Sequence, residues 1–290
     1  MSLFICAISA LFWSFFDLTR KLCLKKTSPQ ILLLIFSFSQ IIIFSFWCLI
    51  ATTNILINEY LWLGLFLIII NIISAIFFLK SLTLSDISMT IPLLSFSPLF
   101  SAFFSYLLLS ESINFFQYVG IFLIIFGTML LYTRSLNFKD LVFSLTLIFS
   151  DKGAKYMLFV SLIWSITPIF DKLCFKYASF NIHGFIQALG MFLILTILEM
   201  KKERIFPQIS QLSKDFKLLS ITMLVGTIAT ILQFFAISLA FVPIMESMKR
   251  SIGQIGAVIY GKYIFNEKVT IKKILGIFII SFGTFFVLLF

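Results

Sequence analysis

Long apolar stretches separated by short polar breaks run the length of the chain. Most contain about 20 residues, enough for a helix to cross the roughly 30 Å hydrocarbon core of a bilayer. The short alternating segments of a membrane β-barrel are missing from the sequence. The pattern therefore predicts an all-α, polytopic membrane protein with ten transmembrane helices, at 2–22, 31–51, 60–80, 87–109, 115–133, 156–176, 182–199, 218–240, 244–264 and 274–290.

Composition supports this prediction. Hydrophobic residues make up 61% of the chain and charged residues only 12%. A soluble domain is nearer half apolar and a quarter charged, so this chain has more apolar surface than an aqueous fold can hide. The four cysteines lie in or beside apolar segments without CxxC spacing. We expect them to be small core residues, and we expect neither a metal site nor a cofactor.

Parts of the first half of the sequence recur in the second. "LFWSFFDLTRKLCLK" (11–25) aligns without a gap with "LIWSITPIFDKLCFK" (162–176), and "VGIFLIIFGT" (119–128) with "LGIFIISFGT" (275–284). "FFLKSL" (77–82) and "FFAISL" (234–239) are a third match in the same order. We expect two related five-helix repeats, at 1–133 and 156–290, joined by a linker at 134–155.

Five is an odd number of crossings, so the second repeat is expected to enter the membrane from the opposite face. Inverted repeats of this kind are typical of secondary transporters, whose substrate site lies near the bilayer midplane between the repeats. The alternative is the fusion of a structural dimer that has no role in transport. The glycine pairs Gly120/Gly127 and Gly276/Gly283 are expected to allow close helix packing.

Two regions resemble a known family. "MTIPLLSFSPLFSAFFSYLLLSESINFFQYVGIFLIIFGTMLLY" (89–132) resembles the fourth and fifth helices of EamA-type members of the drug/metabolite transporter superfamily, and 247–286 is similar to the same region of a second repeat. Glu111 and Glu267 occupy matching short loops, for which we favour a structural role at a helix start. The repeats differ where Leu93 and Leu94 stand against Lys249 and Arg250. The resemblance implies transport of amino acids, nucleotide-like metabolites, sugars or drugs.

Basic residues are distributed unevenly between the two faces. The odd-numbered loops and adjoining helix ends hold all of the 22 Lys and Arg residues except Lys172, Lys176, Lys249 and Arg250. By the positive-inside rule the odd-numbered loops are cytoplasmic and both termini lie outside. The family resemblance implies the reverse, with both termini in the cytoplasm. The net charge of +10 is explained by this topology and by contact with anionic lipid, and it does not indicate nucleic-acid binding.

Ionisable residues inside the predicted spans are the candidate site, because charges in a bilayer are costly and default to functional hypotheses. Trp13 and Asp17 share one face of the first helix, and Trp164 and Asp171 have the same spacing in the sixth. Glu246, Lys249 and Arg250 can pair within the ninth. We expect one cluster of Asp171 with Lys249 or Arg250, and another of Asp17 with Lys80 or Arg20. These clusters would bind substrate or act as gates; alternatively, both aspartates make fixed ion pairs near helix ends.

Other polar residues in the predicted spans allow only less specific predictions. The amides of Gln40, Asn71, Gln187 and Gln233 either line a cavity or bond to a neighbouring helix. The single histidine, His183, is expected near the outer surface and is not favoured as a proton relay.

No enzyme motif is present: HExxH, a P-loop, GxGxxG and GxSxG are all missing, so we expect no enzymatic activity. The leading hypothesis is a secondary transporter in the cell (inner) membrane. Its partners would be a small organic metabolite (amino acids, S-adenosylmethionine-like metabolites or drugs), membrane lipid and, as one option, protons as the coupling ion, with the protein a monomer or homodimer. The alternatives are a lipid-linked substrate flippase and a non-transporting membrane scaffold.

Overall fold

The computed structural model describes residues 2–85, 90–132, 151–200, 216–266 and 270–289. In this part of the chain every regular element is a helix, and a single isolated β-bridge joins Ile55 to Ala178. The predicted all-α fold is therefore confirmed. Much of the predicted linker, and Glu267, lie outside the described residues.

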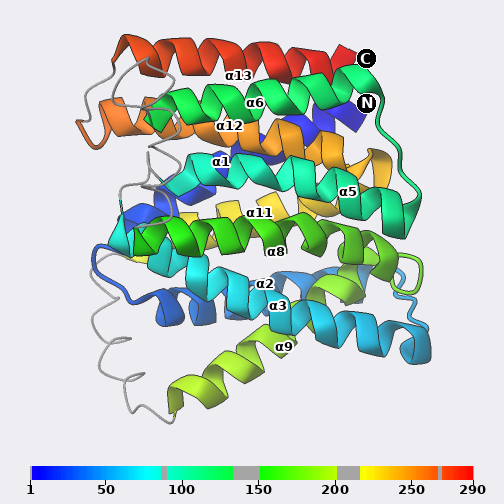
Figure 1. Cartoon of the computed structure of the whole chain (residues 1–290). Helices are drawn as coiled ribbons and strands as arrows, with labels where there is room; N and C mark the ends of the chain where they lie inside the picture. The colour runs from blue at the N-terminus through cyan, green and yellow to red at the C-terminus, as the bar shows by residue number, and fades with distance from the viewer. Residues whose placement is uncertain (1, 86–89, 133–150, 201–215, 267–269, 290) are drawn as a thin grey trace.

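The helices follow the predicted spans closely (Figure 1). Those of the first half are α1 (Ser2–Cys23), α2 (Pro29–Ile50), α3 (Ile57–Leu84), the 3₁₀ helix η1 (Ile91–Phe96), α5 (Ser97–Leu109) and α6 (Phe115–Tyr132). Those of the second half are α8 (Lys152–Cys174), α9 (Phe180–Met200), α11 (Phe216–Leu239), α12 (Val242–Tyr263) and α13 (Ile271–Leu289). Helix α8 begins at Lys152 rather than at 156, because the Asp151 side chain caps it by accepting from Ala154 N at 2.7 Å.

Seven of the described helices are long and apolar enough to cross a membrane: α1, α2, α3, α8, α9, α11 and α13. Two shorter apolar stretches, Leu93–Leu109 and Phe115–Leu130, accompany them. Large apolar side chains also cover the outside of the protein, where Phe4 is 69% and Trp62 76% exposed. Such a surface suits hydrocarbon and not water, so the chain is a multi-pass membrane protein.

The predicted continuous helix at 87–109 is wrong in detail. A 3₁₀ helix occupies Ile91–Phe96, and a regular α-helix begins only at Ser97. Pro92 and Pro98 stand in the first two positions of these two helices, where the lost backbone N–H costs little. Each proline removes a donor from the turn before it, and the helical segment changes from 3₁₀ to α geometry at Ser97 without an interruption.

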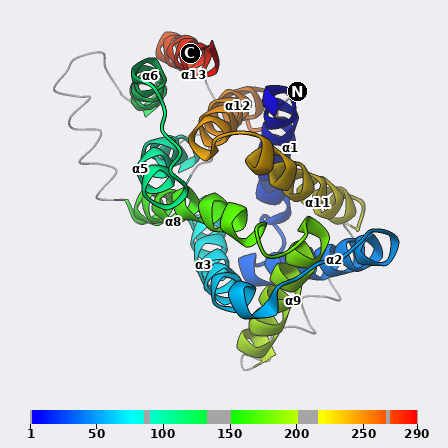
Figure 2. The ribbon, with the colours of Figure 1, turned by 90° about the vertical axis from the view of Figure 1, so that its right-hand side faces the viewer.

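Helices from the two halves alternate in the bundle. Looking along the helices, α1 lies between α11 and α12, while α8 lies between α3 and α5 (Figure 2). The C-terminal end of α1 and the N-terminal end of α8 lie together, since Lys21 Nζ donates to Ser85 O at 3.2 Å and Ser85 Oγ to Asp151 Oδ1 at 3.0 Å. The two helices that carry the longest sequence match therefore run in opposite directions.

Helices α6 and α13 pack as a separate pair at one edge of the bundle (Figure 2). A Cβ added at Gly120 would lie 2.6 Å from Gly283 O, and one at Gly127 would lie 2.8 Å from Gly276 O. These distances are shorter than any side chain tolerates, so both helices need glycine at the contact. The predicted close packing of the glycine pairs is confirmed.

Candidate functional site: a polar cavity between the two halves

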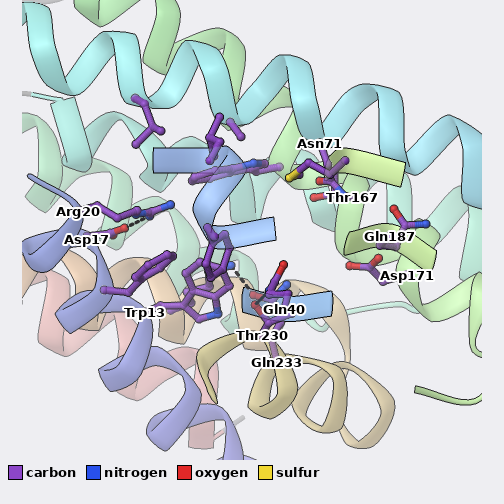
Figure 3. Close-up of a pocket in the computed structure, with 18 of the residues that line it drawn as sticks. Trp13, Asp17, Arg20, Gln40, Asn71, Thr167, Asp171, Gln187, Thr230 and Gln233 are labelled. Carbon is purple, nitrogen blue, oxygen red and sulfur yellow. Dashed lines mark hydrogen bonds and ion pairs between the residues drawn. The ribbon is translucent and has the colours of Figure 1, made fainter. Parts of the chain in front are cut away.

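A cavity of about 170 Å³ lies in the middle of the bundle. It is lined from both halves, by α1, α2, α3 and η1 on one side and by α8, α9, α11 and α12 on the other. Six of the seven predicted site residues line it: Trp13, Asp17, Trp164, Asp171, Lys249 and Arg250. In Figure 3, Trp13, Asp17 and Arg20 lie toward one end and Asp171 and Gln187 toward the other.

At the α1 end, Asp17 forms an ion pair with Arg20 one turn later on the same helix (Figure 3). The guanidinium of Arg20 also stacks over Phe16 and Phe78, at 4.2 and 4.4 Å from the ring centroids. Of the two cations predicted to pair with Asp17, Arg20 is therefore the partner. Lys80 lies instead over the ring of Phe77, at 5.8 Å.

Helix α12 carries one acid shared by two bases. Arg250 Nη2 lies 2.6 Å from Glu246 Oε2, and Lys249 Nζ lies 3.5 Å from Glu246 Oε1. Ser97 of α5 donates to the same carboxylate at 2.9 Å and accepts from Arg250 Nε at 2.7 Å. The pairing predicted within this helix is confirmed. Glu246 is fully buried behind the cavity wall and offsets one of the two positive charges that line it.

The two cations reach toward the paired tryptophans. Lys249 Nζ lies 4.6 Å from the ring centroid of Trp13 and donates to Gln233 Oε1 at 2.6 Å. Arg250 lies 5.5 Å from the ring of Trp164. Both tryptophans thus face the charged part of the cavity, where ring faces attract cations.

The two tryptophans are not equivalent, although the repeat aligns them. Trp164 Nε1 donates to Ser74 Oγ at 3.0 Å, which fixes its ring against α3. Trp13 Nε1 is buried and has no hydrogen-bond partner among the described residues. Trp13, a residue of the cavity wall, thus keeps a donor that the described protein groups do not use, whereas Trp164 is held by the protein itself.

The predicted cluster of Asp171 with Lys249 or Arg250 is wrong. Asp171 Oδ1 lies 3.2 Å from His183 Nε2 of α9, and His183 Nδ1 lies 2.9 Å from Tyr60 Oη of α3. Gln187 Nε2 completes this group by donating to Tyr60 Oη at 3.3 Å and to Gly64 O at 3.0 Å. The cations of α12 are instead turned toward their own Glu246.

Sequence reasoning missed His183 and Tyr60 as members of this group. His183 is 0% exposed rather than near the surface, and Tyr60 is 4% exposed. The signal available was that the chain's only histidine lies at the start of the span that follows the one ending near Asp171. The amides Gln40, Asn71, Gln187 and Gln233 all line the cavity, which resolves the alternatives left open for them. Gln40, Gln187 and Gln233 also bond to neighbouring helices, so both alternatives hold for these three.

Glu111 lies away from the cavity and joins the two halves. It accepts from Lys172 Nζ at 2.6 Å and from the backbone N–H of Val242, the first residue of α12, at 2.9 Å. Lys172 also donates to Ala240 O at 2.9 Å, just beyond the end of α11. The acid therefore lies at a helix start, as predicted, but the helix is α12 of the other half rather than the adjacent α6.

In the described residues no group of three His, Cys, Asp or Glu side chains is arranged to hold a metal ion, and all four cysteines are free thiols.

The helical fold, the apolar exterior and the polar cavity define a multi-pass membrane protein. The chain belongs to the EamA-like transporter family, whose family model matches residues 1–133 and 151–289. Members of this family are generally transporters of small molecules. No curated protein matches the chain. A solved protein chain described only as "Crystal structure of protein" shares the fold, with a TM-score of 0.70 and 12% identity over 99% of this chain and 97% of that one.

Proposed function

We propose that the protein is a secondary transporter that moves small organic metabolites across the cell (inner) membrane by alternating access. The observation that carries this proposal is the cavity, because one polar space in the centre of a membrane bundle is lined by charged side chains from both halves. Charges and amides buried at that depth are costly unless they serve a ligand or pair with one another. A space between two halves can open to either face when the halves rock.

We further propose ten crossings arranged as two inverted five-helix repeats, at 1–133 and 156–290 with the linker 134–155. The opposite directions of α1 and α8 support the inversion. Helix packing supports it as well, since the contact of α3 with α8 is matched by that of α11 with α1. The contact of α5 with α8 is matched in the same way by that of α12 with α1.

The substrate class follows from the polar groups that the protein leaves unpaired. Near Trp13, an indole N–H and the Nε–H of Arg20 are buried donors without a partner in the described part of the chain. Near Asp171, Gln187 Oε1 is a buried acceptor that also has no partner in the described part of the chain. A molecule with an acceptor-rich anionic group at one end and a donor-rich cationic group at the other would satisfy both ends. Amino acids and S-adenosylmethionine-like metabolites have this character.

The charge distribution favours odd-numbered loops in the cytoplasm. The α1–α2 connection carries Lys25 and Lys26 and lies at the opposite end of the bundle from both marked termini (Figure 1). We propose that the termini are external. Reporter fusions to the C-terminus and to the α1–α2 connection test this topology, and cytoplasmic activity of the C-terminal fusion would contradict it.

Two alternatives are less well supported. A lipid-linked substrate flippase needs a free basic headgroup site, whereas Lys249 and Arg250 share Glu246 and face an internal cavity. A non-transporting scaffold predicts a packed interior, and the cavity argues against that.

Uptake into proteoliposomes tests the function. We would reconstitute the purified protein and measure uptake and counterflow of radiolabelled amino acids, nucleotides and S-adenosylmethionine, using protein-free liposomes as the blank. Lys249→Gln should abolish uptake of any compound that the protein carries. Glu59→Gln is the matched control, since Glu59 is exposed in the first turn of α3. Uptake by Lys249→Gln equal to that of Glu59→Gln would remove Lys249 from the site.

A further inference from the structure

Three side chains from three helices form a continuous hydrogen-bonded chain at one end of the cavity. Asp171 of α8, His183 of α9 and Tyr60 of α3 are 7%, 0% and 4% exposed. The imidazole connects the other two, with 3.2 Å from Nε2 to Asp171 Oδ1 and 2.9 Å from Nδ1 to Tyr60 Oη. Asp171 and His183 both line the cavity, so this hydrogen-bonded group meets the cavity at these two residues.

The neutral imidazole satisfies this chain completely. Its Nε2–H donates to Asp171, the Tyr60 hydroxyl donates to Nδ1, and the Tyr60 oxygen accepts from Gln187 Nε2. Both ring nitrogens of a protonated imidazole are donors. With a second proton, Nδ1 would donate to Tyr60 Oη instead of accepting from it, and the Tyr60 hydroxyl hydrogen would have no acceptor.

Gln187 supplies the acceptor that the protonated state needs. Its Oε1 is buried and has no hydrogen-bond partner in the described part of the chain, although its Nε2 has two. Rotation of the amide would bring Oε1 to the Tyr60 hydroxyl and break the bond from Nε2 to Gly64 O. Because Gln187 lines the cavity, protonation of the ring would change the cavity wall.

We infer that His183, held between Asp171 and Tyr60, is the proton-binding site that couples transport to a proton gradient. The inference rests on the proposed transport function and adds its coupling ion. An imidazolium is stabilised by the carboxylate in direct contact with it. Rotation of the Gln187 amide would then change the contacts between the cavity wall and the bound substrate.

In the described residues, few other titratable or charged groups lie near the Asp171–His183–Tyr60 group. The Cys174 thiol lies near Asp171 on α8, Phe175 and Phe234 pack their rings against the imidazole, and Phe180 packs against Phe175. From α1 and α12 the same cavity receives charged groups of both signs: Asp17, Arg20, Lys249 and Arg250. Each of these has its own ion-pair partner within its helix. Protonation of His183 would therefore add an ion pair with Asp171 and break none of the others.

A direct test uses the fact that His183 is the only histidine in the chain. The protein, purified through a histidine-free tag and placed in nanodiscs, would be labelled with ¹⁵N-histidine and followed by NMR across the range in which imidazole titrates, about pH 5 to 8. We expect the ring nitrogens to shift with pH and Tyr60→Phe to move the Nδ1 signal. Thr196→Val is the matched control, because Thr196 lies on α9 and its hydroxyl donates to Phe192 O of the same helix. Ring signals that do not change with pH would overturn the inference.

Flux measurements separate coupling from transport. Proteoliposomes would be loaded with the pH dye pyranine, and the panel compound with the highest uptake would be the probe. The wild-type protein should accumulate it under a pH gradient, with a matching pyranine signal. His183→Gln should lose this accumulation and retain counterflow, while Thr196→Val keeps both. Gradient-driven accumulation by His183→Gln, or wild-type uptake that ignores the gradient, would overturn the inference. Absence of all uptake and counterflow by the wild-type protein would instead overturn the proposed function.

If His183→Gln also loses counterflow, Tyr60→Phe is the variant that tests the coupling, because it keeps the histidine and removes only the hydroxyl. A weakened coupling ratio with normal counterflow in Tyr60→Phe supports the inference, and an unchanged ratio contradicts it.

Discussion

Glu246 and Arg250 lie one turn apart on α12 with 2.6 Å between Glu246 Oε2 and Arg250 Nη2, and their side chains are 0% and 5% exposed. Lys249 is the second cation on the same carboxylate. The acid therefore permits two positive charges to line a cavity inside the membrane. Breaking such a buried pair from one side costs much more than the pair itself contributes.

Glu246→Gln should be among the most destabilising single changes in the protein. Glutamine keeps the shape and some hydrogen bonds but leaves two buried cations without an acid. We expect a loss of roughly 3–5 kcal/mol in the free energy of unfolding. Thermal unfolding in detergent would measure it, with the exposed Glu59→Gln as the control. Equal melting temperatures for the two variants would show that the carboxylate is not needed.

Gly120→Ala should weaken the contact between α6 and α13. The added methyl would meet Gly283 O at 2.6 Å, and a backbone atom cannot move aside as a side chain does. We expect destabilisation of about 1–3 kcal/mol, as for overpacking in a core. Gly253→Ala is the control for stability, since a Cβ at Gly253 meets nothing within 4 Å. Equal free energies of unfolding for Gly120→Ala and Gly253→Ala would contradict the close approach of α6 and α13.

The two tryptophans should respond differently to replacement by phenylalanine. Trp164→Phe removes the bond to Ser74 Oγ and should cost about 1 kcal/mol of stability. Trp13→Phe removes a donor that has no protein partner in the described residues, so stability should hardly change. If that donor serves the substrate, the KM for uptake should rise in Trp13→Phe. Comparable melting temperatures and comparable KM values in both variants would contradict the asymmetry.

Lys172→Met should weaken the contact between the two halves at the end of the bundle where α8 ends, and so make the cavity easier to reach from that end. Lys172 joins Glu111 of the first half to Ala240 O of the second, and its loss leaves Glu111 bound to Val242 N and Ser105. We expect a cysteine placed at Thr167, on the cavity wall, to react severalfold faster with a water-soluble thiol reagent. Native cysteines would first be replaced by serine. The same reaction rate with and without Lys172 would show that this ion pair does not close the cavity.

Much of the site was predictable because the repeat marks it. Trp13 and Trp164, and Asp17 and Asp171, stand at equal spacing in matching segments, and all four line the cavity. Charges within one helix were also predictable, since residues three and four apart share a face, as Glu246, Lys249 and Arg250 do. Partners on different helices were not. Asp171 pairs with His183 and not with Lys249, because α3 packs against both α8 and α9 and so decides which side chains meet.

The sequence by itself determined that the chain is a helical membrane protein, where its spans lie and that its halves are related, because those properties follow from local hydropathy and from repeated residues. Only the tertiary structure decided where the fourth predicted span changes from 3₁₀ to α geometry, which acid pairs with which cation, that the lone histidine is buried between an aspartate and a tyrosine, and which buried polar atoms lack a partner in the described residues. The reason is physical: hydropathy places a helix in the membrane, but its rotation and neighbours depend on contacts between residues far apart in the chain.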